Sequence, residues 1–167
     1  MNESYAEAGV KRKQTMKNQL IKAAMIAAIV VVVVFGSLII GSFAMLIACA
    51  LIVVAVYVFP RMNVEYEYVF CDGQLDFDKI MGNAKRKTAL RIDFDKVDMM
   101  APANSHVLDS YNHMQLKVKD FTSLMPDRKV YAVIVREGES ALKVLFEPNE
   151  KMVACIKQKA PRKISEY

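Results

Sequence analysis

The feature that most constrains this chain is a run of 38 consecutive residues without a charged side chain, from Ala23 to Pro60. A single helix of that length would measure about 57 Å, whereas a bilayer core about 30 Å thick needs only about 20 residues. The run therefore predicts two membrane-spanning helices joined by a turn. Two glycine–serine pairs near its middle, Gly36-Ser37 and Gly41-Ser42, are both compatible with such a turn.

We expect a transmembrane helical hairpin over residues 15–60, with helices at about 15–40 and 42–59. Pro60 marks the exit, because proline cannot continue a helix interior. Neither helix shows the polar face of a soluble helical hairpin. Small residues recur at helical spacing, and they either allow close helix packing or dimerisation or are simply tolerated apolar positions. They are Ala23, Ala24, Ala27, Ala28, Gly41, Ala44 and Ala48.

Charges that flank the apolar run predict its orientation. Residues 1–22 carry five cations against two acids, the predicted turn carries no charge, and Arg61 follows the second helix. Because positive flanks stay on the cytoplasmic side, both ends of the hairpin are expected in the cytoplasm. This predicts a multi-pass protein of the plasma (inner) membrane with cytoplasmic N- and C-termini. Residues 1–14 are interpreted as a basic cytoplasmic N-terminus.

After Pro60 the apolar pattern changes to a period of two, which is typical of half-buried strands. Asp72-Gly73, a strong hairpin signal, follows the first of them. The pattern predicts seven strands in a meander, at about residues 64–70, 75–79, 87–94, 97–101, 114–120, 130–136 and 141–147, with turns at Gly82-Asn83 and Glu137-Gly138-Glu139. A helix from about 148 to 159 and a tail at 161–167 complete the chain. We therefore expect an all-β barrel or sandwich over 62–160, with the C-terminal helix covering its open end.

The segment "EYEYVFCDGQLDFDKIMGNAKRKTALRIDFDKVDMM" (Glu65–Met100) resembles the first four strands of bacterial membrane proteins with a pleckstrin-homology-like (PH-like) domain. In that group a tyrosine-rich strand, an Asp-Gly turn and a basic hairpin follow a two-helix anchor. With "VKRK" near the start and "FEPNEKM" before the last helix, the chain also resembles small two-span membrane proteins of Gram-positive anaerobes. The resemblance implies a PH-like fold and a membrane location. The loop at 102–113 does not match the pattern.

Two groups of side chains are candidate sites. The first is cationic and is hypothesised to contact anionic lipid headgroups: Lys11, Arg12, Lys13, Lys85, Arg86 and Lys87. An ordinary solvated turn is the alternative for 85–87. The second is the loop that holds His106, Asp109 and His113, which are weak candidates for Zn²⁺ because their spacing matches no helical zinc motif. Solvent-exposed loop side chains are the alternative there.

No catalytic motif accompanies these groups. Strand alternation places several aspartates on solvated faces, namely Asp76, Asp78, Asp93, Asp95 and Asp98. The cysteines Cys49, Cys71 and Cys155 are widely spaced, so we expect them to be free in a reducing compartment. No cofactor is expected.

The sequence therefore favours a membrane-anchored cytoplasmic interaction or scaffold module without enzymatic activity. Its expected partners are the lipid bilayer, anionic headgroups and an unidentified protein, and it is compatible with homo-oligomers. Nucleic acid is not expected, because residues 62–167 carry 17 Lys/Arg against 16 Asp/Glu. One alternative is a small channel or transport accessory subunit formed by oligomerised hairpins, although such paths usually contain ionisable residues. A metal-dependent enzyme that uses the 106–113 loop is the other.

Overall fold

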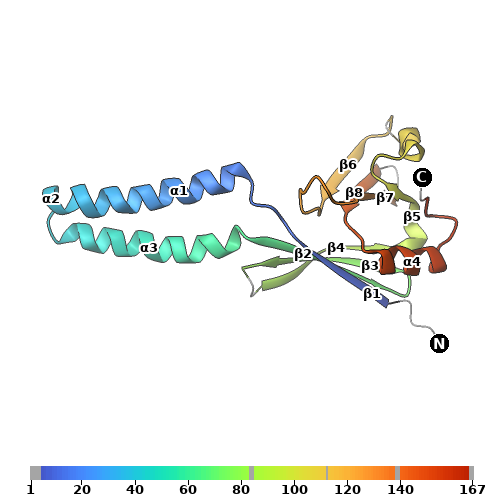
Figure 1. Ribbon diagram of the computed structural model, residues 1–167, viewed down its shortest axis with the longest axis horizontal. Helices are drawn as coiled ribbons and strands as arrows, with labels where there is room; N and C mark the ends of the chain where they lie inside the picture. The colour runs from blue at the N-terminus through green and yellow to red at the C-terminus, as the bar shows by residue number, and fades with distance from the viewer. Residues whose placement is uncertain (1–4, 83–84, 112, 138–139, 166–167) are drawn as a thin grey trace. The chain divides into compact units, whose positions relative to one another are not determined.

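The computed structural model describes residues 5–82, 85–111, 113–137 and 140–165 (Figure 1). The predicted turn residues Asn83, Gly138 and Glu139 lie outside this part. The chain divides into a helical unit, residues 13–64 and 81–85, and a sheet unit formed by the residues before, between and after these segments. In chain order the elements are β1 (Tyr5–Lys11), α1 (Met16–Val31), a π-helical turn (Val32–Gly36), α2 (Ser37–Ile39), α3 (Phe43–Arg61), β2 (Val64–Cys71), β3 (Gln74–Met81), β4 (Lys85–Asp93), β5 (Val97–Pro102), β6 (Leu116–Asp120), β7 (Tyr131–Glu137), β8 (Ser140–Phe146) and α4 (Glu150–Lys159).

The apolar run forms two helices that are long and apolar enough to cross a membrane, Met16–Ile39 and Phe43–Arg61. The chain reverses at Gly41, whose φ is +62°. A side chain would be strained in that conformation, which explains the glycine. Of the two glycine–serine pairs, Gly41-Ser42 therefore lies at the turn and Gly36-Ser37 stays within the helix. The second helix continues through Pro60, because a proline in the last turn removes only one backbone donor.

The two helices meet along positions that alternate by three and four residues. The buried or half-buried side chains along this seam are Ala44, Ala48, Leu51, Ala55 and Val58 on α3, and Met25, Ile29, Val32 and Gly36 on the other helix. Such spacing is typical of left-handed coiled-coil packing. A Cβ atom on Gly36 would lie only 3.1 Å from the Cβ of Ala44, so small residues allow the close approach. The four alanines at 23, 24, 27 and 28 are exposed instead.

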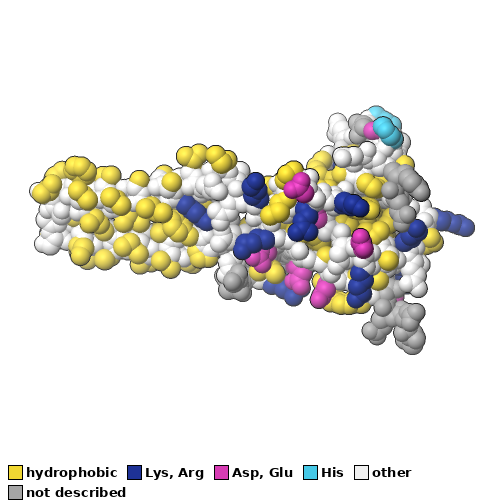
Figure 2. Space-filling model, viewed as in Figure 1, with side chains coloured by type: hydrophobic (Ala, Val, Ile, Leu, Met, Phe, Trp, Pro, Cys, Tyr) yellow, Lys and Arg dark blue, Asp and Glu magenta, His cyan; other side chains and the backbone are white. Residues whose placement is uncertain are grey.

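Large apolar side chains cover the outside of both helices, as Figure 2 shows. Where the helices join the rest of the chain, cations and aromatic rings replace them. The Lys22 Nζ donates to the Asn63 Oδ1 at 3.4 Å and lies 6.0 Å from the Phe59 ring centroid. The Arg61 guanidinium carbon lies 3.7 Å from the Tyr57 ring centroid. Aromatic and cationic side chains in this position are typical of the boundary between lipid and water.

Strand β1 is the main departure from the predicted fold. It pairs antiparallel with β2 through seven residue pairs, from Tyr5↔Cys71 to Lys11↔Glu65, in a sheet of order β1-β2-β3-β4. The expected number of seven strands was therefore wrong, because the described residues form eight. The strand was missed because its inward positions hold the small residues Ala6 and Ala8, which leave a weak period-two signal.

The position of β1 changes how the helical hairpin is attached. The helical hairpin lies in the chain between two neighbouring antiparallel strands, so it interrupts a β-hairpin of the sheet unit. Ala6 is fully buried, which makes β1 part of the core. The sheet unit therefore needs residues on both sides of the hairpin.

The second sheet has the strand order β5-β7-β8-β6. Its strand β6 pairs parallel with β8, so the predicted meander is wrong in this half of the fold. The strands form two open four-stranded sheets rather than a closed barrel, because neither sheet returns to its own first strand. The tail after α4 covers the β5 edge, where the Met100 N–H donates to the Lys163 carbonyl at 2.6 Å and the Ser165 N–H donates to the Met100 carbonyl at 2.8 Å.

Aromatic rings fill the space between the two sheets. The Phe77 ring centroid lies 4.8 Å from that of Phe121, 5.5 Å from that of Phe146 and 5.6 Å from that of Tyr68. Phe77, Tyr68 and Phe146 are completely buried. Rings from both sheets and from the segment after β6 thus form one core.

The C-terminal helix α4 covers part of this core, as predicted. The Asn149 Oδ1 accepts a hydrogen bond from the Met152 N–H at 2.8 Å, which caps the helix at its start. Its own side chains Met152 and Ile156 are fully buried. The Asn149 side-chain amide also donates to the Glu7 carbonyl of β1 at 2.9 Å, so α4 is tied to the strand that sequence reasoning missed.

The described part of the loop at 102–113 packs against the outer face of the second sheet. Its residues His106–Tyr111 form a 3-10 helix whose Leu108 is buried. Leu108 joins Ala101, Ala132 and Ile134 in a second, smaller apolar cluster. The segment that matched no family pattern therefore serves to cover apolar strand positions.

Candidate interaction site

The three weak metal candidates do not converge. The His106 Nδ1 lies 3.2 Å from the Asp109 Oδ2, and the His106 side chain is fully exposed. His113 does not join them: within the described residues there is no group of three or more His, Cys, Asp or Glu side chains placed to hold a metal ion. The 102–113 loop thus presents one solvent-exposed pair.

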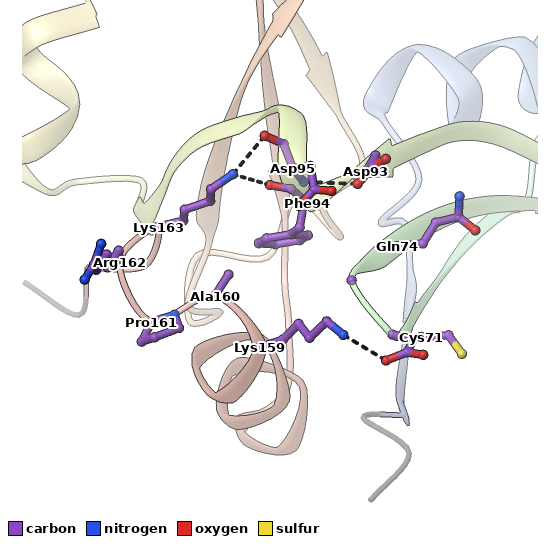
Figure 3. A pocket seen from close by; sticks show the side chains of 12 residues that line it. Cys71, Gln74, Asp93, Phe94, Asp95, Lys159, Ala160, Pro161, Arg162 and Lys163 are labelled. Atoms are coloured by element: carbon purple, nitrogen blue, oxygen red, sulfur yellow. Dashed lines mark hydrogen bonds and ion pairs between the residues drawn. The ribbon is translucent and has the colours of Figure 1, made fainter. Parts of the chain in front are cut away.

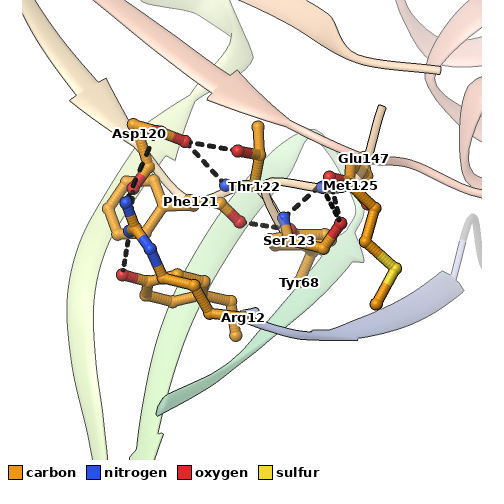
Figure 4. Close-up of polar contacts among 9 residues, drawn as sticks. Arg12, Tyr68, Asp120, Phe121, Thr122, Ser123, Met125 and Glu147 are labelled. Atoms are coloured by element: carbon orange, nitrogen blue, oxygen red, sulfur yellow. Dashed lines mark hydrogen bonds and ion pairs between the residues drawn. The ribbon is translucent and has the colours of Figure 1, made fainter. Parts of the chain in front are cut away.

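Arg12, one of the predicted lipid-contacting cations, is bound within the sheet unit (Figure 4). Its guanidinium donates to the Tyr66 hydroxyl at 2.8 Å and to the Asp120 carbonyl at 3.2 Å, and it lies 3.5 Å from the Asp120 Oδ2. Lys11 lies 3.4 Å from Glu65, but the Lys11 side chain is 71% exposed and that of Glu65 is 37% exposed. Lys13 is exposed. Arg12 therefore joins the end of β1 to the end of β6.

The run Lys85-Arg86-Lys87 lies at the start of β4 and not in a turn. Arg86 and Lys87 point to opposite faces of the strand, and the side chain of Lys85 lies outside the described part. The Arg86 guanidinium lies 2.7 Å from Asp78 and 2.8 Å from Glu67. Lys87 is exposed. The two described side chains, Arg86 and Lys87, therefore do not share one basic face.

Asp78 is the buried partner in this group, with only 8% of its surface exposed. Burial has the largest single effect on the pKa of its carboxyl group, and by itself it raises that pKa. Hydrogen bonds from Thr88 and Arg86 outweigh that effect, so the pKa of Asp78 lies below its usual value. The expectation of a solvated face fails for Asp78. Asp76, by contrast, is only half-buried and forms a bidentate pair with Arg91 at 2.7 and 2.8 Å.

Arg86→Ala is expected to destabilise the sheet unit measurably, because it leaves the buried Asp78 carboxylate without its charged donor. Lys87→Ala is the matched control, and its effect is expected to stay within about 0.5 kcal/mol. The pKa of Asp78 is lower in the folded state than in the unfolded chain. Its contribution to folding stability is therefore present above the unfolded-state pKa of about 3.9 and is lost as the pH falls through the folded-state pKa. The difference between wild type and Arg86→Ala should therefore shrink in acid. Urea unfolding across pH measures this, and equal effects of the two substitutions would contradict it.

A buried polar network joins the segment after β6 to both sheets (Figure 4). The Tyr68 hydroxyl donates to the Phe121 carbonyl at 2.5 Å. The Glu147 Oε1 accepts from the Ser123 N–H at 2.7 Å and from the Ser123 hydroxyl at 2.8 Å. Burial raises the pKa of Tyr68, and the nearby Glu147 carboxylate raises it further, so the phenol keeps its proton. Sequence reasoning missed this network because its members are far apart in the chain.

The sheet unit also carries a groove of about 890 Å³, which we call the tail groove (Figure 3). It lies between the β2–β3 turn (residues 71–74), the β4–β5 connection (93–95) and the end of α4 with the tail (159–163). The Lys159 Nζ lies 3.0 Å from Asp72. The Lys163 Nζ donates to the carbonyls of Phe94 at 2.7 Å and Asp95 at 2.9 Å.

The charges of the tail groove balance. Three cations, Lys159, Arg162 and Lys163, face three carboxylates in its lining. Lys159 already pairs with Asp72, and Lys163 already donates to backbone carbonyls of the groove. Arg162 makes no ion pair within the described ranges. The groove therefore has no marked preference for an anion. The sequence did not indicate it, because three segments that are distant in the chain line it.

A comparison with protein families agrees with this architecture. Residues 2–166 match the model of the family described as bacterial PH-like domain (DUF6106). No curated protein and no solved structure matches the chain significantly. The matched residues run from before β1 to the tail, so they include the helical hairpin as well as both sheets. The chain therefore belongs to this family of bacterial PH-like domains.

Proposed function

We propose that this protein is a membrane-anchored interaction module without enzymatic activity, whose anchor interrupts its own PH-like domain. The observation that carries the proposal is the position of the apolar hairpin between the paired strands β1 and β2. A hairpin whose outside is covered by large apolar side chains needs lipid around it. Two chain connections, one on each side of the hairpin, then tether the sheet unit to the membrane.

The plasma membrane is the proposed location, with both chain termini and the sheet unit in the cytoplasm. Five cations precede the first helix within residues 1–22, Arg61 ends the second, and the turn around Gly41 carries none. This distribution follows the positive-inside rule. Lys11 and Lys13, a few residues before α1, are proposed to contact anionic headgroups, each contributing about 1 kcal/mol near the surface.

An interaction role is proposed over catalysis because the charged groups hold the fold together. Arg12 and Arg86 bind carboxylates inside the sheet unit, and Glu147 holds a backbone N–H and a hydroxyl. Catalytic groups, in contrast, are aimed at a site where substrate can bind. Membership of a PH-like family supports the same proposal.

Membrane fractionation tests the anchoring directly. The full chain is expected to stay in the membrane pellet after an alkaline wash and to be released by detergent, because a spanning hairpin is held by the bilayer core. A variant in which Asn-Gly replaces residues 13–63 is the matched control, and it is expected in the soluble fraction. Release of the full chain by the alkaline wash alone would overturn the proposal.

A further inference from the structure

One edge of the second sheet is open within the part of the chain that the structure describes. β6 is the last strand in the order β5-β7-β8-β6, and its strand partner is β8. The opposite edge is covered, because the tail bonds to Met100 of β5. β6 is therefore the edge of this sheet to which another strand can be added.

The hydrogen bonds of β6 show which of its backbone groups face outward. The Phe121 N–H donates to the Leu145 carbonyl at 2.9 Å, in register with the parallel β6–β8 ladder. Because successive residues of a strand direct their backbone groups to opposite sides, Lys119 and Lys117 also bond toward β8. The N–H and C=O groups of Val118 then point away from β8. The Asp120 carbonyl follows the same alternation and accepts a hydrogen bond from Arg12 on the outer side.

The side chains of β6 indicate what kind of strand fits there. Val118 is 59% exposed, which is unusual for a valine in a sheet. Lys117 and Lys119 are exposed on the opposite face, and the register places Lys143 of β8 beside Val118. Within the described ranges none of these three lysines forms an ion pair. Within the described ranges, the open edge thus combines the outward N–H and C=O groups of Val118, one apolar side chain and an excess of positive charge.

We propose that β6 binds an extended acidic segment of a partner protein, which adds a fifth strand to the second sheet. Acidic side chains of that segment lie opposite Lys117 and Lys119, and an apolar side chain lies opposite Val118. Lysines on an edge strand oppose unspecific strand pairing, so they also select against segments that lack acids. This inference rests on the proposed function, and it names the class of partner.

Two labelled peptides test the charge preference in the full chain held in detergent. The first is acetyl-Val-Glu-Val-Glu-Val-amide, whose glutamates match the spacing of Lys117 and Lys119, and the second carries lysine in place of glutamate. Fluorescence anisotropy is expected to show the acidic peptide binding at least about tenfold more tightly, a difference of about 1.4 kcal/mol. The variant Lys117→Glu with Lys119→Glu is expected to reverse the preference. Failure of the acidic peptide to bind, or equal binding of the two peptides, would overturn the proposal.

Val118→Pro tests the backbone contact separately. Proline removes the outward N–H, but that group does not take part in the β6–β8 ladder, so the fold is expected to tolerate the change at an edge. Binding of the acidic peptide should weaken at least about tenfold, a loss of about 1.4 kcal/mol. Val118→Thr is the matched control, because it keeps the N–H and should retain most of the binding. Unchanged binding by Val118→Pro would overturn the proposal. If this variant unfolds, the charge-reversal variant decides.

Two further outcomes distinguish this inference from its alternatives. Concentration-dependent dimerisation that Val118→Pro abolishes and the acidic peptide does not disturb would assign the edge to a second copy of the chain, which overturns the proposal. If the full chain stays in the membrane pellet but does not bind the acidic peptide, the β6 proposal is wrong and the proposed anchoring stands.

Discussion

Replacing residues 13–63 with Asn-Gly is expected to give a water-soluble protein that unfolds cooperatively, whereas a fragment of residues 62–167 is expected to aggregate or to unfold at a far lower temperature. The β1–β2 register ends at Lys11↔Glu65, so its continuation places Arg12 opposite Val64. A two-residue Asn-Gly turn closes such a pair. The shorter fragment lacks β1 and leaves the β2 edge and the core beneath Ala6 exposed.

The size of this effect follows from the small stability of single domains. A domain is stable by only about 5–15 kcal/mol, and each lost kcal/mol lowers Tm by about 4–8 °C at this size. Loss of a whole strand is therefore expected to lower Tm by about 20 °C or to abolish the transition. Circular dichroism during heating, with size-exclusion chromatography, measures both proteins. A fragment as stable as the Asn-Gly variant would show that β1 is dispensable.

The second large effect is expected from Phe77→Ala, which removes the ring at the centre of the aromatic core. Phe77 is completely buried, and its ring lies within 5.6 Å of three other rings. Truncating such a side chain leaves a cavity and costs about 3–5 kcal/mol. Urea unfolding of the Asn-Gly variant, with and without Phe77→Ala, measures the difference.

Two controls define what that result means. Phe77→Leu keeps most of the apolar volume and is expected to cost clearly less, about 1–2 kcal/mol. Val118→Ala changes a mostly exposed side chain and is expected to stay within about 0.5 kcal/mol. If Phe77→Ala costs no more than Val118→Ala, the rings do not form the shared core of the two sheets.

Parts of the fold could be predicted because their signals are local. The uncharged run from Ala23 to Pro60 requires two apolar helices whatever the rest of the chain does. Alternation with large side chains, as in Tyr66, Tyr68 and Phe70, identifies strand β2. β1 gave no such signal, because alanine occurs in all types of structure. The parallel pairing of β6 with β8 depends on contacts between distant residues, which a local pattern does not contain.

The candidate sites were harder to predict than the fold. The run at 85–87 was interpreted as a cluster because its cations are adjacent in sequence. On a strand, however, neighbouring side chains point to opposite faces. Arg86 binds Asp78 of the adjacent strand β3. The tail groove is built from three separate segments, so no single motif marks it. The open edge of β6 depends on strand order, which only the structure provides.

The most direct test of the proposed membrane anchor is cysteine accessibility in intact cells. Cys71 is exposed at the end of β2, and Ser42 lies at the turn of the helical hairpin. In a background in which Cys49 and Cys155 are replaced by alanine, a membrane-impermeant maleimide should leave Cys71 unlabelled until the cells are permeabilised. With Cys71 also replaced, Ser42→Cys should be labelled without permeabilisation. Labelling of Cys71 in intact cells, or protection of Ser42→Cys, would contradict a hairpin that crosses the membrane twice with both ends in the cytoplasm.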